Sequence, residues 1–326
     1  MEKYLRACLQ SLIIENSDLQ KQLEVLVVND GSKDNSLEIA EEFSKLNPDV
    51  FRVIDKKNGN YGSCVNRGLK EATGKYVKIL DADDSFDSNG LRELVIVLSN
   101  VDVDMLLSDY VTVREDGTVT GNYKFQIPSN TILRAADYID CFNRIQMHAV
   151  VYRLENLRKI NYIQTEGISY TDQEWVFIPL TTIRTFYYLD TVVYKYLVGR
   201  SGQTVELGTY HKRVSDRVKM VRNIVALFVQ FKNDNKSGIY DSFLTKRATE
   251  LIHSIYLSYV IVNRDSAGAG DFDNFLKTSS TELYGLCDNL IVYKFLPFKY
   301  IAYWRTRGML PPKLLSNAYR WLKSIR

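Results

Sequence analysis

The sequence predicts an α/β fold, a mostly parallel sheet sandwiched by helices, followed by an all-helical region. Short apolar runs alternate with helical patterns between residues 4 and 113, as they do in βαβ units. Beyond Tyr210 the helical patterns follow one another without strands between them. The length of 326 residues also suits two domains. We therefore expect an α/β domain over residues 1–208 and a helical domain over residues 209–326.

The individual elements follow from the spacing of apolar residues. Helical spacing from Tyr4 to Ile13 predicts that the chain begins with an amphipathic helix. The apolar run from Leu23 to Val28 predicts a strand buried on both faces, closed by a turn at Asn29 to Ser32. Further helices are expected at 36–46, 61–72, 91–98, 214–231, 240–262 and beyond 283, and further strands at 51–54, 76–80 and 105–113.

Composition narrows the classes of function. With 45% hydrophobic and 25% charged residues the chain is globular. A net charge of +3 is too small to indicate a nucleic-acid partner. The four cysteines form no CxxC pair, which favours a reducing compartment. Neither a signal peptide nor an apolar run of about 18 residues is found. We expect a cytoplasmic protein.

The most informative motif is Lys78-Ile79-Leu80-Asp81-Ala82-Asp83-Asp84, an apolar strand that ends in acids. Side chains alternate along a strand, so Asp81 and Asp83 can point to one side and share a divalent cation. Such a cation would bridge the phosphates of a diphosphate. The alternative is that these acids only solvate a turn or cap the next helix, as Asp87 and Ser88 can do equally well.

Two further segments accompany this motif: Val28-Asn29-Asp30-Gly31-Ser32, and the stretch from Asn58 to Tyr76 that leads into the acidic strand. Together the three resemble the family 2 glycosyltransferases with the GT-A fold, of the type that builds bacterial surface and capsular polysaccharides. The resemblance covers about half of the chain. It implies an inverting transferase that takes a nucleotide-diphospho-sugar, usually with uridine, together with Mn²⁺ or Mg²⁺.

The resemblance also implies roles for individual residues. Asp30 matches the aspartate that binds the base, although a turn before a helix would explain it equally well. Asp81 and Asp83 match the DxD motif that contacts ribose and metal, and Asp84 is a neighbour that could join them. Asn58, Gly59, Gly62, Asn66 and Arg67 lie where donor contacts occur in the family, and a plain turn or a solvated helix face is the alternative for each.

Asp172 is the candidate catalytic base, because it matches the second acid of the family's acidic pair. The chain departs from the pattern in that Thr171 replaces the first acid. Thr171 and Glu174 also form a complete S/T-x-x-E capping box, which gives these residues a structural role without catalysis. Glu166 is a candidate for binding acceptor hydroxyl groups.

The segment Tyr196 to Thr204 resembles a loop found in relatives that build surface polysaccharides. Arg200 is expected to neutralise the diphosphate, with Gln203 and Thr204 as donors, and an exposed loop arginine is the alternative. His211 is a weaker candidate metal ligand, because a lone histidine is usually not one.

Residues 290–326 contain eight Lys or Arg residues and no acid, mixed with aromatic residues. This composition suits peripheral contact with the inner face of an anionic membrane, and it suits equally a pair of covering helices with basic outer faces. At the other end, family members begin with an apolar strand that is missing before Met1. We expect the true start to lie upstream.

The preferred function is transfer of a sugar from a nucleotide diphosphate, UDP being the usual one, to a glycan or lipid-linked acceptor. One alternative is a magnesium phosphohydrolase, but Asp84 does not fit that motif. A second alternative is a truncated, inactive domain that binds a nucleotide or a partner transferase.

Overall fold

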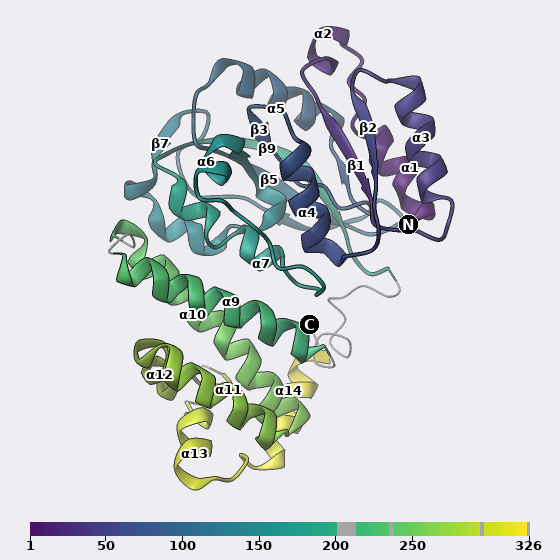
Figure 1. The fold of residues 1–326 in the computed structure, drawn as a ribbon. Coiled ribbons are helices and arrows are strands. Elements are labelled where there is room, and N and C mark those ends of the chain that lie inside the picture. The colour runs from purple at the N-terminus through teal and green to yellow at the C-terminus, as the bar shows by residue number, and fades with distance from the viewer. Residues whose placement is uncertain (201–212, 235–237, 294–296, 325–326) are drawn as a thin grey trace. The chain divides into compact units, whose positions relative to one another are not determined.

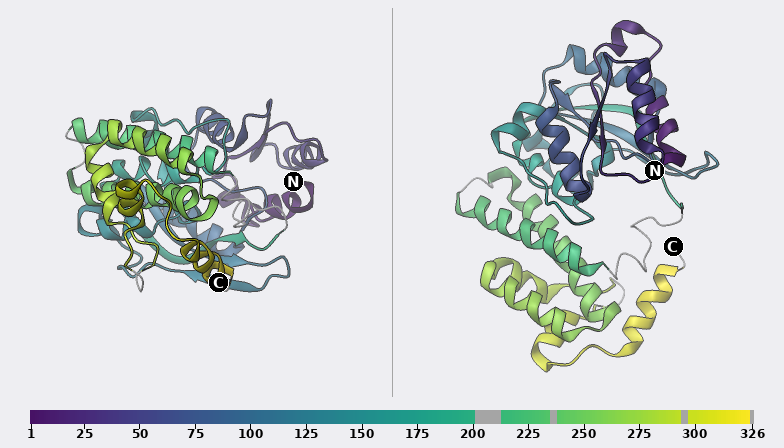
Figure 2. Two further views of the ribbon diagram at one scale, coloured as in Figure 1. Left: turned by 90° about the horizontal axis from the view of Figure 1, so that it is seen from below. Right: turned by 45° about the vertical axis from the view of Figure 1, so that its right-hand side comes forward.

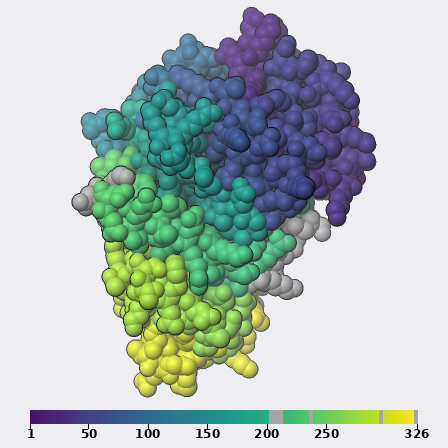
Figure 3. All heavy atoms as spheres, in the orientation of Figure 1, coloured from purple at the N-terminus to yellow at the C-terminus, as the bar shows by residue number. Residues whose placement is uncertain are grey.

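The computed structural model describes residues 1–200, 213–234, 238–293 and 297–324. The chain divides into two compact units, Met1–Gln203 and Thr204–Arg326. They are coloured purple to teal and green to yellow in Figures 1 and 3. The expected boundary between residues 208 and 209 lies outside the described residues.

The N-terminal part of the first unit contains a two-stranded parallel sheet made of β1 (Val25–Asn29) and β2 (Phe51–Asp55). Helix α3 (Ser36–Leu46) connects the two strands and packs against both, and α1 (Glu2–Gln10) packs on α3 (Figure 1). Leu5, Cys8 and Leu9 form the buried stripe of α1. These two helices and two strands were all predicted, and the structure confirms them with slightly shifted ends.

A seven-stranded sheet forms the centre of the first unit, with the strand order β3-β8-β5-β9-β4. Strand β6 pairs with β5, and β7 pairs with β9. The bounds are β3 (Tyr76–Val77), β4 (Ser85–Phe86), β5 (Met105–Val113), β6 (Val119–Tyr123), β7 (Ile132–Arg134), β8 (Val150–Arg153) and β9 (Thr185–Leu197).

This sheet is mixed rather than mostly parallel. The buried strand β5 pairs in parallel with β9, whereas β5–β6, β5–β8, β3–β8, β4–β9 and β7–β9 are antiparallel. For β6 the reason is local, because the chain turns back at Arg114 to Thr118 and a hairpin can only give antiparallel strands. The α/β class itself is confirmed.

The strand predicted over 76–80 ends at Val77, so the prediction was too long. Strand β3 finds a partner only in β8, and only for two residues. Beyond it, Lys78 turns its ammonium group toward the carbonyl oxygens of His148 (2.7 Å) and Val150 (3.2 Å). An apolar run predicts that its side chains are buried. It does not show how many of its residues pair with a neighbouring strand, and here only two do.

The other helices of the first unit surround these sheets. Helix α5 lies so close to β9 that a Cβ on Gly90 would come within 2.0 Å of the Val192 carbonyl oxygen. Asp87 caps α5 through the backbone N–H groups of Asn89 and Gly90, as one of the alternatives anticipated. The bounds are α2 (Ser17–Gln20), α4 (Asn60–Glu71), α5 (Ser88–Asn100), α6 (Leu154–Lys159) and α7 (Asp172–Trp175).

The described part of the second unit is helical, as expected. Helices α9 and α10 pack together around apolar side chains such as Val221, Phe228 and Phe243, and a π-helical segment, Leu257–Asn263, extends α10 (Figure 2). The bounds are α9 (Val214–Asn233), α10 (Asp241–Tyr256), α11 (Ser266–Ser279), α12 (Thr281–Leu286), α13 (Tyr300–Arg307) and α14 (Lys313–Ser324). Within the described ranges, no helix has the length and apolar character needed to cross a membrane.

Candidate active site

The loop between β3 and β4 carries the predicted acids. The Asp84 N–H donates to the Asp81 carbonyl oxygen at 3.0 Å, which makes a turn just before β4 pairs with β9. Burial, and then the carboxylates of Asp83 and Asp172, raise the pKa of Asp81 to about 7. The fold therefore brings the two acids of the DxD motif into the electrostatic field of the predicted base.

Arg200 lies beside this loop. Its Nε donates to Asp83 Oδ2 at 2.6 Å, and both side chains are largely buried, with exposed fractions of 20% and 14%. The guanidinium also lies over the ring of Tyr4, 5.7 Å from the centroid. Arg200 is thus placed next to the acids rather than on an exposed loop, and its positive charge is available to a group bound there.

Asp84 faces away from this group. Its carboxylate accepts from the Tyr194 hydroxyl at 2.6 Å and from the Leu197 N–H at 2.7 Å, and only 3% of the residue is exposed. Burial and the nearby Asp81 raise its pKa to about 8. These contacts tie the acidic loop to β9, so the role of Asp84 in the described contacts is to hold the loop.

Asp30 follows β1 and lies in a second polar group. Its carboxylate pairs with Lys56 (2.5 Å) and accepts from the Gly59 N–H (2.9 Å), while Asn58 donates to its carbonyl oxygen (3.0 Å). Burial acts to raise the pKa of Asp30, but the hydrogen bonds from Lys56 and Gly59 lower it below its usual value. Asp30 therefore stays ionised beside Asn58 and Gly59, and its expected contact with the nucleotide base remains a prediction.

The first turn of α4 links these groups through Tyr61, which no sequence motif singled out. The Tyr61 hydroxyl donates to Met147 Sδ at 3.3 Å and lies close enough to Asp81 to lower the pKa of that carboxyl. Burial, together with Asp81 and Asp172, raises its pKa well above the usual value. Next to it, Gly62 lies so close to Thr165 that a Cβ would come within 2.0 Å of the Thr165 carbonyl oxygen.

Asp172 is the first residue of the short helix α7. Gln173 donates to its carboxylate at 2.8 Å. The alternative capping box does not form, because the Thr171 side chain makes no cap hydrogen bond. Glu174 instead accepts from both the N–H (2.7 Å) and the hydroxyl (2.6 Å) of Thr165 and is 1% exposed. Glu174 thus fixes the loop before α7, and Asp172 remains near the acids.

Asn66 and Glu166 contact each other beside α4. Asn66 donates to Glu166 (2.9 Å) and to the Gln164 carbonyl oxygen (2.9 Å), and accepts from the Gln164 N–H (2.8 Å). Both residues line a surface pocket of about 480 Å³ between α4 and α6. Asn66 therefore holds the loop that leads to α7. Arg67 pairs with Glu71 at 2.9 Å on the exposed face of α4, which is the structural alternative for that residue.

Comparison with known proteins decides the family. Residues 1–159 match the family model described as "Glycosyl transferase family 2". These residues are a family 2 glycosyltransferase domain. Asp30, Asn58, Asp81 and Asp83 lie within the matched range, whereas Asp172 and Arg200 lie beyond it.

Named relatives of the family 2 domain are bacterial. The putative glycosyltransferase EpsH of Bacillus subtilis is 32% identical over 115 residues, which cover 35% of this chain and 32% of EpsH. Glycosyltransferase GlyA of Streptococcus pneumoniae is 27% identical over 170 residues, 52% of this chain and 23% of GlyA. The uncharacterized glycosyltransferase YibD of Escherichia coli is 26% identical over 77% of this chain and 75% of its own length. The chain thus spans a third or less of the first two relatives.

The likeness to solved structures extends beyond the family 2 domain. The crystal structure of S. aureus TarS residues 1–349 in complex with UDP-GlcNAc superposes with a TM-score of 0.68 at 17% identity, covering 98% of this chain and 88% of that one. At this identity the likeness concerns the fold. The chain has the GT-A-type α/β fold that the sequence resemblance implied, followed by a helical region.

A row of stacked rings next to the acids was not foreseen. His148 stacks on Tyr196 with centroids 4.4 Å apart and lies 5.1 Å from Tyr110, which in turn stacks on Tyr123 at 4.4 Å. Burial and Lys78 lower the pKa of His148 to about 3, so this ring is neutral. Burial, then Asp84 and the other acids of the site, raise the pKa of Tyr196 to about 12. The ring of Tyr196 thus lies beside the acidic loop.

The donor set of the acidic loop fits a divalent cation. Asp81 and Asp83 supply hard carboxylate oxygens, and the raised pKa of Asp81 reflects burial first and then repulsion from Asp83 and Asp172, which a cation would relieve. Among the described residues, no group of three or more His, Cys, Asp or Glu side chains is arranged around a metal position. The predicted contacts of Gln203, Thr204 and His211 lie outside the described residues.

Proposed function

We propose that the chain is an inverting glycosyltransferase that moves a sugar from a uridine diphosphate donor to a hydroxyl group of a glycan or lipid-linked acceptor. The observation that carries the proposal is the convergence of Asp81, Asp83 and Asp172 in one electrostatic field, with Arg200 on Asp83. Family 2 membership of residues 1–159 supports the class of reaction, and UDP-GlcNAc in the TarS complex supports a uridine nucleotide.

In the proposed reaction Asp172 removes the proton of the acceptor hydroxyl, whose oxygen attacks the anomeric carbon from the side opposite the diphosphate. The bond between the anomeric carbon and the diphosphate oxygen breaks, and its electron pair stays with the nucleotide. Asp81 and Asp83 would hold Mn²⁺ or Mg²⁺, which would supply positive charge to the diphosphate. Arg200 adds a second positive charge. Asp30 and Asn58 bind the uracil base of the nucleotide.

The surroundings of each acid suit its role. Asp172 opens a helix, where the backbone N–H groups favour an ionised carboxylate. Tyr61 partly offsets the raised pKa of Asp81, and Glu174 fixes the loop before α7. Glu166 lies in the pocket between α4 and α6, which we propose as a place for further sugar units of the acceptor. Most of the catalytic effect would then come from positioning and fixed charges.

The test measures release of UDP from UDP-sugars with Mn²⁺, with Mg²⁺ and with chelator. We expect release with either metal, none with chelator, and a loss of at least 100-fold in Asp83→Ala. The matched control is Asp49→Ala, which removes an exposed acid from the loop between α3 and β2. Unchanged turnover of Asp83→Ala would contradict the proposal. Stabilisation by UDP and Mn²⁺ without turnover of any donor would favour the inactive binding domain.

A further inference from the structure

Helix α14 of the second unit exposes apolar side chains. Leu314 is 77% exposed and Trp321 is 64% exposed, and Met309, in the segment leading into the helix, is 58% exposed. Leu314 and Trp321 are seven residues apart, which places them on nearly the same face two turns from each other. A large aromatic and a large aliphatic side chain turned to solvent on one helix face are unusual for a surface that contacts only water.

The opposite face of α14 is fixed to the rest of the second unit. Tyr319 is 7% and Ser316 is 3% exposed. Arg264 donates to Ser316 Oγ at 3.2 Å and to the Pro311 carbonyl oxygen at 2.8 Å, and Tyr293 donates to the Tyr319 carbonyl oxygen at 3.3 Å. The outward direction of Leu314 and Trp321 therefore follows from packing of the helix and not from a free end. In Figure 2, α14 (yellow) lies along the edge of the second unit.

The charged residues of α14 are all basic. Lys313 and Arg320 are exposed and again seven residues apart, so they form a row next to Leu314 and Trp321. Arg307, at the end of α13, is also exposed. Among the ion pairs between described residues, none involves Arg307, Lys313 or Arg320, although Arg320 donates to the Val262 carbonyl oxygen at 2.8 Å. Residues 290–326 contain no Asp or Glu that could neutralise these charges.

We propose that this face, defined by Lys313, Leu314, Arg320 and Trp321, docks on the surface of a bilayer that contains anionic lipid. A tryptophan suits the headgroup level of a membrane, and a leucine beside it can enter the acyl boundary. Arginine and lysine next to them are attracted by negative headgroups. Charge complementarity selects the lipid surface over a neutral protein partner, because all charged residues of α14 are basic.

The experiment measures co-sedimentation of the full chain with vesicles of phosphatidylcholine alone or mixed with phosphatidylglycerol. We expect binding to the anionic vesicles at least tenfold stronger than to the neutral ones, and weaker binding at high salt. Leu314→Ser/Trp321→Ser should lower binding to anionic vesicles at least tenfold. Trp175 and Trp304 are 0% and 8% exposed, so a blue shift of tryptophan emission on vesicle binding would report Trp321.

The matched control is Leu46→Ser/Val119→Ser, which removes two apolar side chains, 70% and 57% exposed, from the first unit. It should bind like the unchanged chain. Thermal unfolding of both double variants checks that they fold, which their exposed positions favour. The proposal is overturned if the Leu314→Ser/Trp321→Ser variant binds as well as the unchanged chain, or if the unchanged chain binds neither kind of vesicle. A concentration-dependent dimer that this variant abolishes, without vesicle binding, would also overturn it and assign the face to a second copy.

Discussion

Buried charge is handled in opposite ways in the two units. In the first unit, acids gather in the loop after β3, and the pKa of Asp81 rises to about 7 because of burial and of the like charges of Asp83 and Asp172. Arg200 is the cation paired with this group, through Asp83. The arrangement costs folding free energy, since ionised carboxylates are held together away from water.

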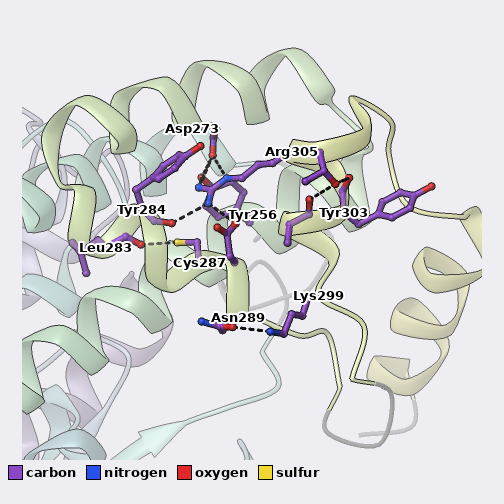
Figure 4. Close-up of polar contacts among 12 residues, drawn as sticks. Tyr256, Asp273, Leu283, Tyr284, Cys287, Asn289, Lys299, Tyr303 and Arg305 are labelled. Atoms are coloured by element: carbon purple, nitrogen blue, oxygen red, sulfur yellow. Dashed lines mark hydrogen bonds and ion pairs between the residues drawn. The ribbon is translucent and has the colours of Figure 1, made fainter.

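In the second unit, one charged group pairs two acids with a single arginine. Arg305 of α13 pairs with Asp273 (2.7 Å) and Asp288 (2.8 Å) and lies over the ring of Tyr284, 3.7 Å from its centroid (Figure 4). Tyr256 donates to Asp273 at 2.5 Å, and Arg305 also donates to the Tyr284 carbonyl oxygen at 2.9 Å. Each charge thus has a partner of opposite sign or a hydrogen bond.

The difference separates a group of charges that needs a ligand from one that does not. A cluster in which each acid is already paired with a cation contributes to stability and offers less for a substrate to compensate. A cluster with excess negative charge gains free energy when a cation binds. The comparison therefore predicts that substitutions in the first group change turnover more than stability, and that substitutions in the second do the reverse.

The largest effect is expected for Asp172→Asn. Asparagine keeps the shape of the side chain but cannot take a proton, so turnover should fall about 10²- to 10⁴-fold. Binding of UDP with Mn²⁺, followed by the rise in melting temperature, should stay within a few-fold of the unchanged protein. Turnover and nucleotide binding are measured on the same preparation. If turnover falls less than threefold, Asp172 is not the base and the role of the acidic group must be assigned again.

Arg305→Met should mainly affect stability. Removing the guanidinium leaves the largely buried Asp273, 14% exposed, without its cation, which costs about 3 kcal/mol of unfolding free energy. Arg307→Met, two residues later on the same helix and exposed, is the matched control and should change stability by less than about 0.5 kcal/mol. Guanidinium unfolding measures both variants. Equal effects would mean that the cluster in the second unit is not a stabilising one.

Patterns that act over a few residues were enough to predict much of the first unit. The strand Met105–Val113 was found with both ends correct, since an apolar run between turn signals needs no knowledge of its neighbours. The acids Asp81 and Asp83 were found in the same way, from a strand followed by carboxylates. Their place in one field with Asp172 was expected from the family resemblance.

What the sequence could not give depends on contacts between distant segments. Tyr61 reaches Met147 across 86 residues, and Asn66 reaches Gln164 across 98. The sequence motif gave no sign that the amide of Asn66 holds the loop before α7, and its expected contact with the donor remains a prediction. The capping box at Thr171 is similar: the pattern was complete, yet Glu174 gains more from two hydrogen bonds to Thr165 than from its own helix end. A local motif allows several hydrogen-bonding roles for a residue, and contacts with distant segments determine which role it takes.

The smallest predicted effect concerns pH and the second unit. Burial lowers the pKa of His253 in α10 to about 4, so the folded chain favours the neutral ring while the unfolded chain takes up a proton near pH 6.5. Its contribution is present above that pH and is lost as the pH falls from 6.5 toward 4. Between pH 7 and 5.5 the loss is about 1 kcal/mol. Acids of the first unit with raised pKa values act in the opposite direction, because they favour the folded state when protonated.

The difference between the unchanged chain and His253→Gln isolates the histidine, since the acids are common to both. Guanidinium unfolding at the two pH values should show a smaller change for the variant, and an equal change would mean that His253 is protonated without cost in the folded chain.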